Sequence, residues 1–295
     1  MAEAGGTLYL VATPIGNLGD VTLRALEVLR AVPLIAAEDT RVTRRLLVRY
    51  EIKTRTTSYH AQSDPARMAE LVGHLRSGAD LALVTDAGTP SISDPGAELA
   101  AAWAGEGGRV EAIPGASAVM VAVAVSGIAG PRWSFEGFLP RRGRERRERL
   151  ARIAGDERGC VIFESPRRLG ATIDDLAGVC GPERPAAICR ELTKMHEQVI
   201  RGTLGDLARF AADGTMDTRG EAVVVVGWSD AEVIAAARAR LTGRGTGGVG
   251  DAAGPTVDAV AQVEALVKGG MSRSEAARRV ARDTGLSRRV LYRVG

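Results

Sequence analysis

Three loops rich in glycine, proline and small polar residues are where this 295-residue chain is most suited to chemistry. They read T-P-I-G-N-L-G-D over 13–20, D-A-G-T-P-S-I-S-D-P-G over 86–96 and P-G-A-S-A over 114–118. Each follows a predicted strand, and open α/β sheets bind ligands at the carboxyl ends of their strands. Small residues let backbone N–H and C=O groups approach a ligand closely. Any one loop alone is also read as a tight turn, but the three together predict a small-molecule pocket.

Alternating strand and helix patterns are expected to position these loops. Predicted strands lie at 7–12, 33–37, 54–59 and 80–85. Predicted helices follow from Asp20, which is expected to cap the first one, and near 40–49 and 65–77. Because the two patterns alternate with short connections, this half is predicted to be an α/β domain with a mainly parallel sheet.

The pattern changes after Pro114. A strongly apolar helix over 117–127 precedes predicted strands at 133–138, 159–163, 185–190, 197–202 and 222–227. Helices are expected near 143–154, 167–179 and 204–212. Because two strands between Cys189 and Gly202 are joined without a helix, the second sheet is predicted to be mixed. The simplest interpretation is a second α/β domain.

The last part of the chain has a different composition. A helix rich in alanine and arginine leads to about Leu241, and a glycine-rich linker follows. Ser272 and Glu275 have the spacing of a capping box, which predicts a helix start. This tail is predicted to be either a helix-turn-helix-like module or a small bundle with a solvated basic face. The expected divisions are 1–113, 114–228, 229–255 and 256–295.

Several function classes are disfavoured by composition. No stretch of about 18 apolar residues exists, and the first residues do not resemble a signal peptide, so a cytoplasmic protein without a membrane span is expected. Three widely spaced cysteines and three histidines without paired spacing predict no metal site. The P-loop motif of nucleotide hydrolases and the G-x-S-x-G motif of serine hydrolases are both missing.

Basic charge is concentrated in two segments. Residues 141–149 contain six arginines against two glutamates, and residues 271–295 contain seven arginines against two acidic residues. Since the whole chain carries only +3, the remainder is acidic. Such clustering favours a polyanionic partner, although a general preference for arginine is an alternative explanation.

The loops also carry a family resemblance. L-Y-L-V-A-T-P-I-G-N-L-G-D, A-E-D-T-R, L-V-T-D-A-G-T-P-S-I-S-D-P-G and P-G-A-S-A resemble the tetrapyrrole-methylase superfamily. F-E-G-F-L-P, F-E-S-P-R-R, R-E-L-T-K and R-G-E extend the match over residues 7–227, in order. Within the superfamily, the chain is most similar to bacterial methyltransferases of 16S ribosomal RNA that modify the 2′-oxygen of a cytidine ribose.

The resemblance implies two α/β domains with S-adenosylmethionine in the cleft between them, a small helical C-terminal tail and a homodimer. Carried over by position, the donor pocket would comprise Pro14, Gly16, Asp86, Ala87, Gly88, Pro90, Ile92, Ser93, Ser117 and Ala118. A sulfonium donor has no phosphate, which fits the missing phosphate-binding motifs. The implied substrate is a cytidine ribose in the decoding region of 16S rRNA, free or within the small ribosomal subunit.

Proton removal from a ribose hydroxyl calls for a general base. Glu38 and Asp39 of A-E-D-T-R are the main candidates, with Arg41 binding an RNA phosphate or pairing with them. A purely structural ion-pair and capping cluster is the alternative. Glu164, Glu191 and His60 are weaker candidates. The family often has His at the position of Arg167, and a second His and an Asn after His60, so roles at those positions are not carried over.

RNA phosphates are expected to contact exposed arginines of both basic segments. The predicted contacts are Arg141, Arg142, Arg144, Arg146, Arg147, Arg278, Arg279, Arg288 and Arg289. Aromatic residues make up only 4% of the chain, and no stacking platform is visible. Two rival functions stay open: a precorrin-type tetrapyrrole methyltransferase, and a non-catalytic RNA-binding ribosome-assembly factor.

Overall fold

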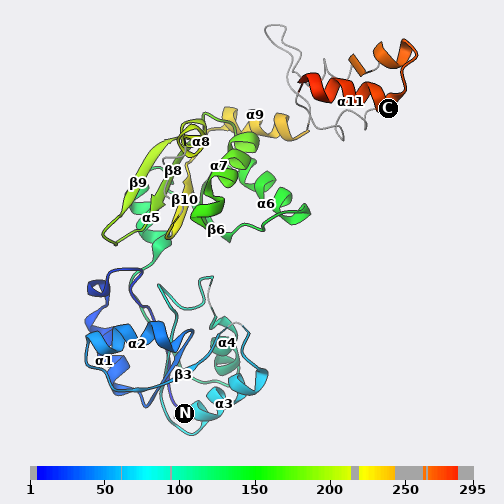
Figure 1. Ribbon diagram of the computed structural model, residues 1–295. Helices are drawn as coiled ribbons and strands as arrows, with labels where there is room; N and C mark the ends of the chain where they lie inside the picture. Colours follow the sequence, from blue (N-terminus) through cyan, green and yellow to red (C-terminus); the bar gives the residue numbers. More distant parts are fainter. Residues whose placement is uncertain are drawn as a thin grey trace. The chain divides into compact units, whose positions relative to one another are not determined.

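The computed structural model describes residues 5–60, 62–93, 95–213, 219–242, 262–263 and 265–284. The chain divides into two compact units, Met1–Gly245 and Thr246–Gly295. The first unit contains two five-stranded sheets, one in each of two α/β lobes (Figure 1). We call the part up to Ile113, where the first sheet ends, the first lobe, and residues 114–242 the second lobe.

The first lobe is built on an all-parallel sheet. Its strands are β1 (Leu8–Val11), β2 (Leu34–Ala37), β3 (Arg55–Ser58), β4 (Leu81–Val84) and β5 (Val110–Ile113), in the order β3-β2-β4-β1-β5. Helices α1 (Leu23–Ala31) and α2 (Thr40–Arg49) pack on one face, and α3 (Pro65–Arg76) and α4 (Ala97–Gly105) pack on the other. Because helices cover both faces, β4 is buried at every position, as its unbroken apolar sequence L-A-L-V requires.

The predicted parallel α/β architecture of this lobe is confirmed, with differences of detail. α4 was not among the predicted elements, and the strand expected before the third loop, which is β5, was given no range. The predicted cap at Asp20 was wrong, because Asp20 lies in a short 3-10 turn, Leu18–Asp20. The hydroxyl of Thr22 instead accepts the N–H of Ala25 at 3.1 Å and begins α1.

The second lobe has the mixed sheet that the sequence predicts. Its strands are β6 (Trp133–Phe138), β7 (Gly159–Glu164), β8 (Pro185–Arg190), β9 (Gln198–Thr203) and β10 (Ala222–Val226), in the order β6-β7-β10-β8-β9. Only the β6–β7 pair is parallel. Helix α5 (Ala118–Ser126) packs on one face. The other face carries α6 (Arg144–Ala154), α7 (Pro166–Cys180), α8 (Leu204–Ala212) and α9 (Ala231–Thr242).

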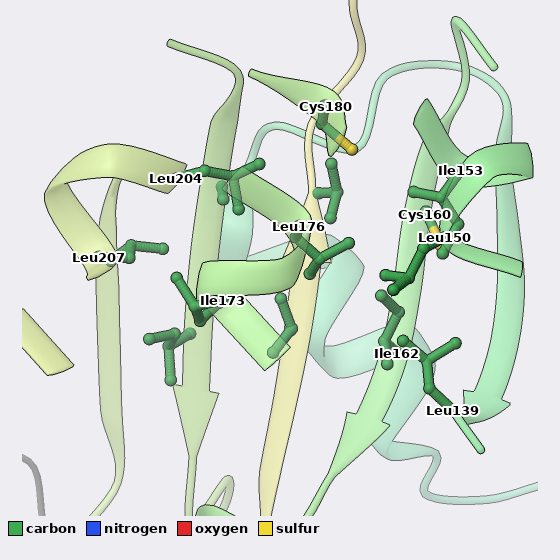
Figure 2. Packing of buried hydrophobic residues seen from close by; sticks show 14 of the residues in the cluster. Leu139, Leu150, Ile153, Cys160, Ile162, Ile173, Leu176, Cys180, Leu204 and Leu207 are labelled. Carbon is green, nitrogen blue, oxygen red and sulfur yellow. The ribbon is translucent and has the colours of Figure 1, made fainter. Parts of the chain in front are cut away.

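Aliphatic side chains fill the core between this sheet and its four helices. Figure 2 shows Leu150 and Ile153 of α6, Ile173 and Leu176 of α7 and Ile162 of β7 among the side chains of this core. All of them are at most 5% exposed. The two cysteines in this core are also buried, and burial raises the pKa of Cys160 to about 12 and that of Cys180 to about 11. Both thiols therefore stay protonated and act as apolar packing groups.

The second unit is described only in part. Helix α11 (Arg273–Thr284) begins directly after Ser272, as predicted, with the Ser272 hydroxyl donating to the Glu275 carboxylate at 2.6 Å. Val263, Ala276 and Val280 form a small buried cluster of their own. The predicted glycine-rich linker lies outside the described residues. Nowhere in the described ranges is a helix both long and apolar enough to cross a membrane.

Candidate active site

Hydrogen bonds join the three loops at the carboxyl edge of the first sheet. The N–H of Thr13 donates to the carbonyl of Gly88 at 2.8 Å, and the N–H of Gly88 donates back to Thr13 at 3.0 Å. The Thr13 hydroxyl also donates to the carbonyl of Thr85 at 3.0 Å. The loop after β2 is attached through Asp39, whose N–H donates to the Asp86 carboxylate at 3.0 Å. The third loop is attached through the carbonyl of Ala116, which accepts the Thr89 hydroxyl at 3.5 Å. The ends of β1, β2, β4 and β5 therefore present one continuous surface.

Two adjoining cavities open on this surface. The larger, of about 490 Å³, includes seven of the ten predicted donor-pocket residues in its lining: Asp86, Ala87, Gly88, Ile92, Ser93, Ser117 and Ala118. The smaller, of about 290 Å³, is lined by Pro14 and Gly16, and both cavities share Ile15, Asp86, Ala87 and Glu221. Pro90 lines neither cavity. The structure thus brings nine of the ten predicted residues to one place.

The second lobe supplies the opposite wall of the larger cavity. Its lining residues there include Phe138, Phe163, Glu164, Ser165, Pro166, Cys189, Glu191, Leu192, Gly220, Glu221, Ala222 and Val223. None of these was among the predicted site residues, although Glu164 and Glu191 were weaker candidates for the base. The signal was present in the sequence, because the matching stretches F-E-G-F-L-P, F-E-S-P-R-R, R-E-L-T-K and R-G-E contain most of this wall.

Glu38 and Asp39 are neighbours with different surroundings. Glu38 lines the larger cavity and accepts the N–H of Asp86 at 3.3 Å. Asp39 lines neither cavity and caps α2 by accepting the N–H of Arg41 at 2.8 Å. Its carboxylate also pairs with the Arg41 guanidinium at 2.6 Å, and this bond lowers the pKa of Asp39 to about 2. Of the two, Glu38 is positioned to act on a bound molecule.

Asp86 stands between the two cavities. Burial raises the pKa of its carboxyl group above the ordinary value, and the N–H of Asp39 acts in the opposite direction. His60 lies elsewhere, in a separate cavity with Asp64, Arg67 and Glu70. Among the described residues of the first lobe, the acidic side chains that line the larger cavity are Glu38 and Asp86, and a cationic ligand would be favoured beside them.

An ion-pair triad belongs to the second lobe. The Lys194 ammonium lies 2.9 Å from both Glu191 Oε1 and Glu221 Oε2. Burial opposes its charge, but these two bonds outweigh that effect and raise the pKa of Lys194. Similarly, burial acts against ionisation of Glu191, but Lys194 and the N–H of Glu221 lower its pKa. Lys194 and Glu191 are therefore both charged at neutral pH.

Glycines at two positions make room for this triad. A Cβ on Gly16 would lie 2.5 Å from Cγ of Lys194, so the first loop can approach the lysine stem only as glycine. Gly220 has a φ of +83°, and a Cβ there would lie 2.2 Å from Glu191 Oε1. Residues 16 and 220 thus permit the close approach of the loops around Lys194.

We expect Gly220→Ala to displace the Glu191 carboxylate and to lower the free energy of unfolding by roughly 1–3 kcal/mol, because the side chain clashes and the backbone is strained. Thermal unfolding monitored by circular dichroism measures this. The control is Gly178→Ala in α7, where an added Cβ meets nothing within 4 Å and stability should be unchanged or raised by up to about 1 kcal/mol. Equal stability of both variants would contradict the role given to Gly220.

Glu164 and Cys189 also line the larger cavity, but neither side chain provides a nucleophile. The Glu164 carboxylate is buried, accepts the hydroxyl of Thr172 at 2.7 Å and lies 3.2 Å from the Arg168 guanidinium. These contacts make it a structural anchor at the start of α7. Burial raises the pKa of Cys189 to about 11, so its thiol stays protonated at neutral pH.

The basic segment after β6 is mostly exposed, with one exception. Arg141, Arg142, Arg144 and Arg147 are exposed. Arg146 is 8% exposed, pairs with Asp175 at 2.7 Å and donates to the hydroxyl of Thr172 at 3.0 Å. Its assignment as a phosphate contact was wrong, because its guanidinium is buried against α7. Arg278 and Arg279 are exposed on α11, and Arg288 and Arg289 lie outside the described residues.

A family model of tetrapyrrole (corrin/porphyrin) methylases matches residues 7–208, which include the three loops at the end of the first sheet. The chain belongs to the tetrapyrrole methylase family. Solved structures agree on the fold. Uroporphyrin-III C-methyltransferase from Thermus thermophilus, complexed with S-adenyl homocysteine, is 20% identical, with a TM-score of 0.54 over 78% of this chain and 99% of its own. Diphthine synthase is 13% identical, with a TM-score of 0.59 over 78% of this chain and 93% of its own.

Two curated relatives carry the same name, that of a ribosomal RNA methyltransferase. Ribosomal RNA small subunit methyltransferase I of a Synechocystis strain is 42% identical over 290 residues, which cover 98% of this chain and 97% of the relative. The protein of the same name from Mycobacterium tuberculosis is 45% identical over 225 residues, 76% of this chain and 78% of its own. The predicted superfamily, fold class and methyltransferase activity are confirmed by these relatives and by the family model.

Proposed function

We propose that this tetrapyrrole methylase transfers a methyl group from S-adenosylmethionine to the 2′-oxygen of a cytidine ribose in the decoding region of 16S rRNA. The observation that carries the proposal is the larger cavity, in which seven residues implied as donor contacts meet Glu38 and the second-lobe wall. The names of relatives at 42% and 45% identity supply the acceptor, ribosomal RNA of the small subunit.

The lining of the larger cavity fits the donor. Its volume of about 490 Å³ is in the range of small-molecule sites, and Ile15, Ile92 and Leu192 give it apolar walls for an adenine ring. Ser117 begins α5 without a side-chain capping bond, so its hydroxyl is available to a polar group of the donor. The nearby carboxylates Glu38 and Asp86 favour a positively charged sulfonium.

Bound there, S-adenosylmethionine supplies an electrophilic methyl group on a positively charged sulfur. The chain's own contribution is to orient the acceptor and remove its proton. Fixing the acceptor hydroxyl in line with a methyl group supplies several kcal/mol of the barrier reduction. A carboxylate oxygen of Glu38 accepts the hydroxyl proton, because Glu38 is the predicted base that faces the cavity. Asp39 and Arg41 hold the start of α2, which positions Glu38.

The acceptor RNA is held in this proposal by exposed arginines. Arg141, Arg142, Arg144 and Arg147 form a basic cluster directly after β6, whose last residue lines the larger cavity. Arg278 and Arg279 on α11 add positive charge in the second unit. Assembly as a homodimer stays a prediction from the family resemblance.

Reversing Arg141, Arg142, Arg144 and Arg147 to glutamate should weaken binding to small-subunit RNA. Each lost phosphate contact should make the slope of log K against log salt shallower by about 0.7 to 0.9. Affinity for the donor should be unchanged. Filter binding over a salt series and calorimetry with S-adenosylmethionine measure the two quantities, and an unaltered salt slope would refute this assignment.

The test of the proposed function uses small ribosomal subunits from cells that lack this protein. Incubation with S-adenosylmethionine labelled in the methyl group should transfer label to 16S rRNA. A protein that binds the donor but labels no RNA would instead support a tetrapyrrole acceptor. A protein that binds subunits but not the donor would support a non-catalytic assembly factor.

A further inference from the structure

A β-bulge in the edge strand β6 determines where Phe138 points. Phe135 pairs with Val161 of β7 and Phe138 pairs with Phe163, so four residues of β6 span three of β7, with the irregularity between Phe135 and Gly137. In a regular strand without this bulge, Phe135 and Phe138 would lie on opposite faces of the sheet, because they are three residues apart and side chains alternate along a strand. With it, both rings pack edge-on against Phe163, at centroid distances of 4.8 and 5.6 Å.

The strand end that carries Phe138 is firmly held. The Arg149 guanidinium donates to the carbonyls of Glu136 and Phe138 at 3.2 and 3.1 Å, and Arg168 donates to the carbonyl of Leu139 at 3.0 Å. Leu139 is 2% exposed and points into the core on the other face of the sheet (Figure 2). The backbone on both sides of Phe138 is therefore fixed before any ligand arrives.

Phe138 is nevertheless 58% exposed, which is unusual for a ring that packs on another aromatic side chain. It lines the larger cavity together with Ile92, which is 41% exposed. Burying an exposed ring and its apolar neighbour against a flat molecule is favourable. The position of Phe138 in the cavity lining suits contact with an acceptor molecule that approaches the donor from solvent.

We propose that Phe138 is a positioning residue that stacks on an unpaired base of the acceptor RNA, and thereby presents the adjacent ribose to the cavity. This inference rests on the proposed function. Aromatic rings combined with a cationic track are the usual means of binding single-stranded nucleic acid. Here the ring is followed within nine residues by the exposed Arg141, Arg142, Arg144 and Arg147. The stacking platform that the sequence did not show is thus formed by three of the chain's four phenylalanines.

The test compares Phe138→Ala with Phe138→Trp. In F138A, the loss of one stacked base should raise two quantities on the order of 5- to 150-fold. They are KM for small ribosomal subunits and Kd for a fluorescent single-stranded oligonucleotide of the decoding region. F138W, which keeps a π-face, should stay near wild type. Because stacking involves no charge, F138A should leave the salt slope of RNA binding unchanged, unlike the arginine reversals.

Two further measurements separate this role from other ones. Affinity for S-adenosylmethionine, measured by calorimetry, should be the same in F138A and wild type. Met120→Ala removes another exposed apolar side chain of the second lobe, 56% exposed and lining neither cavity, and should change neither KM nor Kd.

An F138A variant with wild-type KM and Kd would overturn the inference while leaving the proposed function intact. A matching loss of donor affinity would also overturn it, because the ring would then be a donor contact. A wild-type protein that neither binds nor methylates the RNA would overturn both.

Discussion

Replacing Glu38 with glutamine should lower kcat for methyl transfer by roughly 10²- to 10⁴-fold, the usual contribution of a general base. Glu38 lines the larger cavity, and its carboxylate accepts the N–H of Asp86 at 3.3 Å, so glutamine keeps the shape and this bond but cannot take a proton. Donor affinity should change far less than kcat. Single-turnover transfer to small ribosomal subunits, together with calorimetry, measures both.

Asp39→Asn is the matched control for Glu38. The Asp39 side chain lines neither cavity, and Arg41 holds the pKa of its carboxyl at about 2, so it is a poor base at neutral pH. Asparagine is also a good helix cap, so α2 should form as before. We expect kcat of D39N to stay within a few-fold of wild type. Full activity in E38Q, or equal losses in both variants, would contradict the assignment of the base to Glu38.

Arg184→Ala should cause the largest loss of stability among these variants. Arg184 is 1% exposed and donates to four backbone carbonyls, those of Ile153, Asp156, Arg158 and Gly227, at 2.9 to 3.3 Å. Truncation leaves these acceptors without their donor and opens a cavity. We expect a loss of at least about 3 kcal/mol, because unsatisfied buried groups cost about 1–3 kcal/mol each. The melting temperature should fall by about 6 °C or more.

The control for Arg184 is Arg147→Ala, which truncates an exposed arginine of the same lobe. Its free energy of unfolding should change by no more than about 0.5 kcal/mol. Arg184 lines neither of the two cavities at the site, so R184A should still bind the donor at temperatures where it is folded. A melting temperature equal to that of R147A would show that the four carbonyl bonds contribute nothing to stability.

The first-lobe half of the site could be predicted because its information is local. Each loop follows its strand directly, and parallel strands bring their carboxyl ends to one edge. The second-lobe wall depends on contacts that no local pattern contains. Glu191 and Gly220 meet although they are 29 positions apart, and Phe138 reaches the cavity only because β6 contains a bulge. The signal there was the motif resemblance rather than any periodicity.

For Arg146, by contrast, the sequence contained a local signal of burial that the count of charges did not use. It lies four residues before Leu150 and seven before Ile153, which is the spacing of one helix face. All three side chains are buried in α6. A cluster of like charges on a helix is therefore best divided by face before its members are assigned to a partner. Asp20 failed for a related reason, because the 3-10 turn shifts the helix start to Thr22.

Mapping the position of the transferred methyl group tests the proposed reaction. Small subunits from cells without this protein are treated with S-adenosylmethionine and enzyme, and the 16S rRNA is digested and analysed by mass spectrometry. We expect one new 2′-O-methylcytidine in the decoding region, with far less of it in E38Q than in wild type. A methyl group on a base, or none on RNA from a protein that binds the donor, would contradict it.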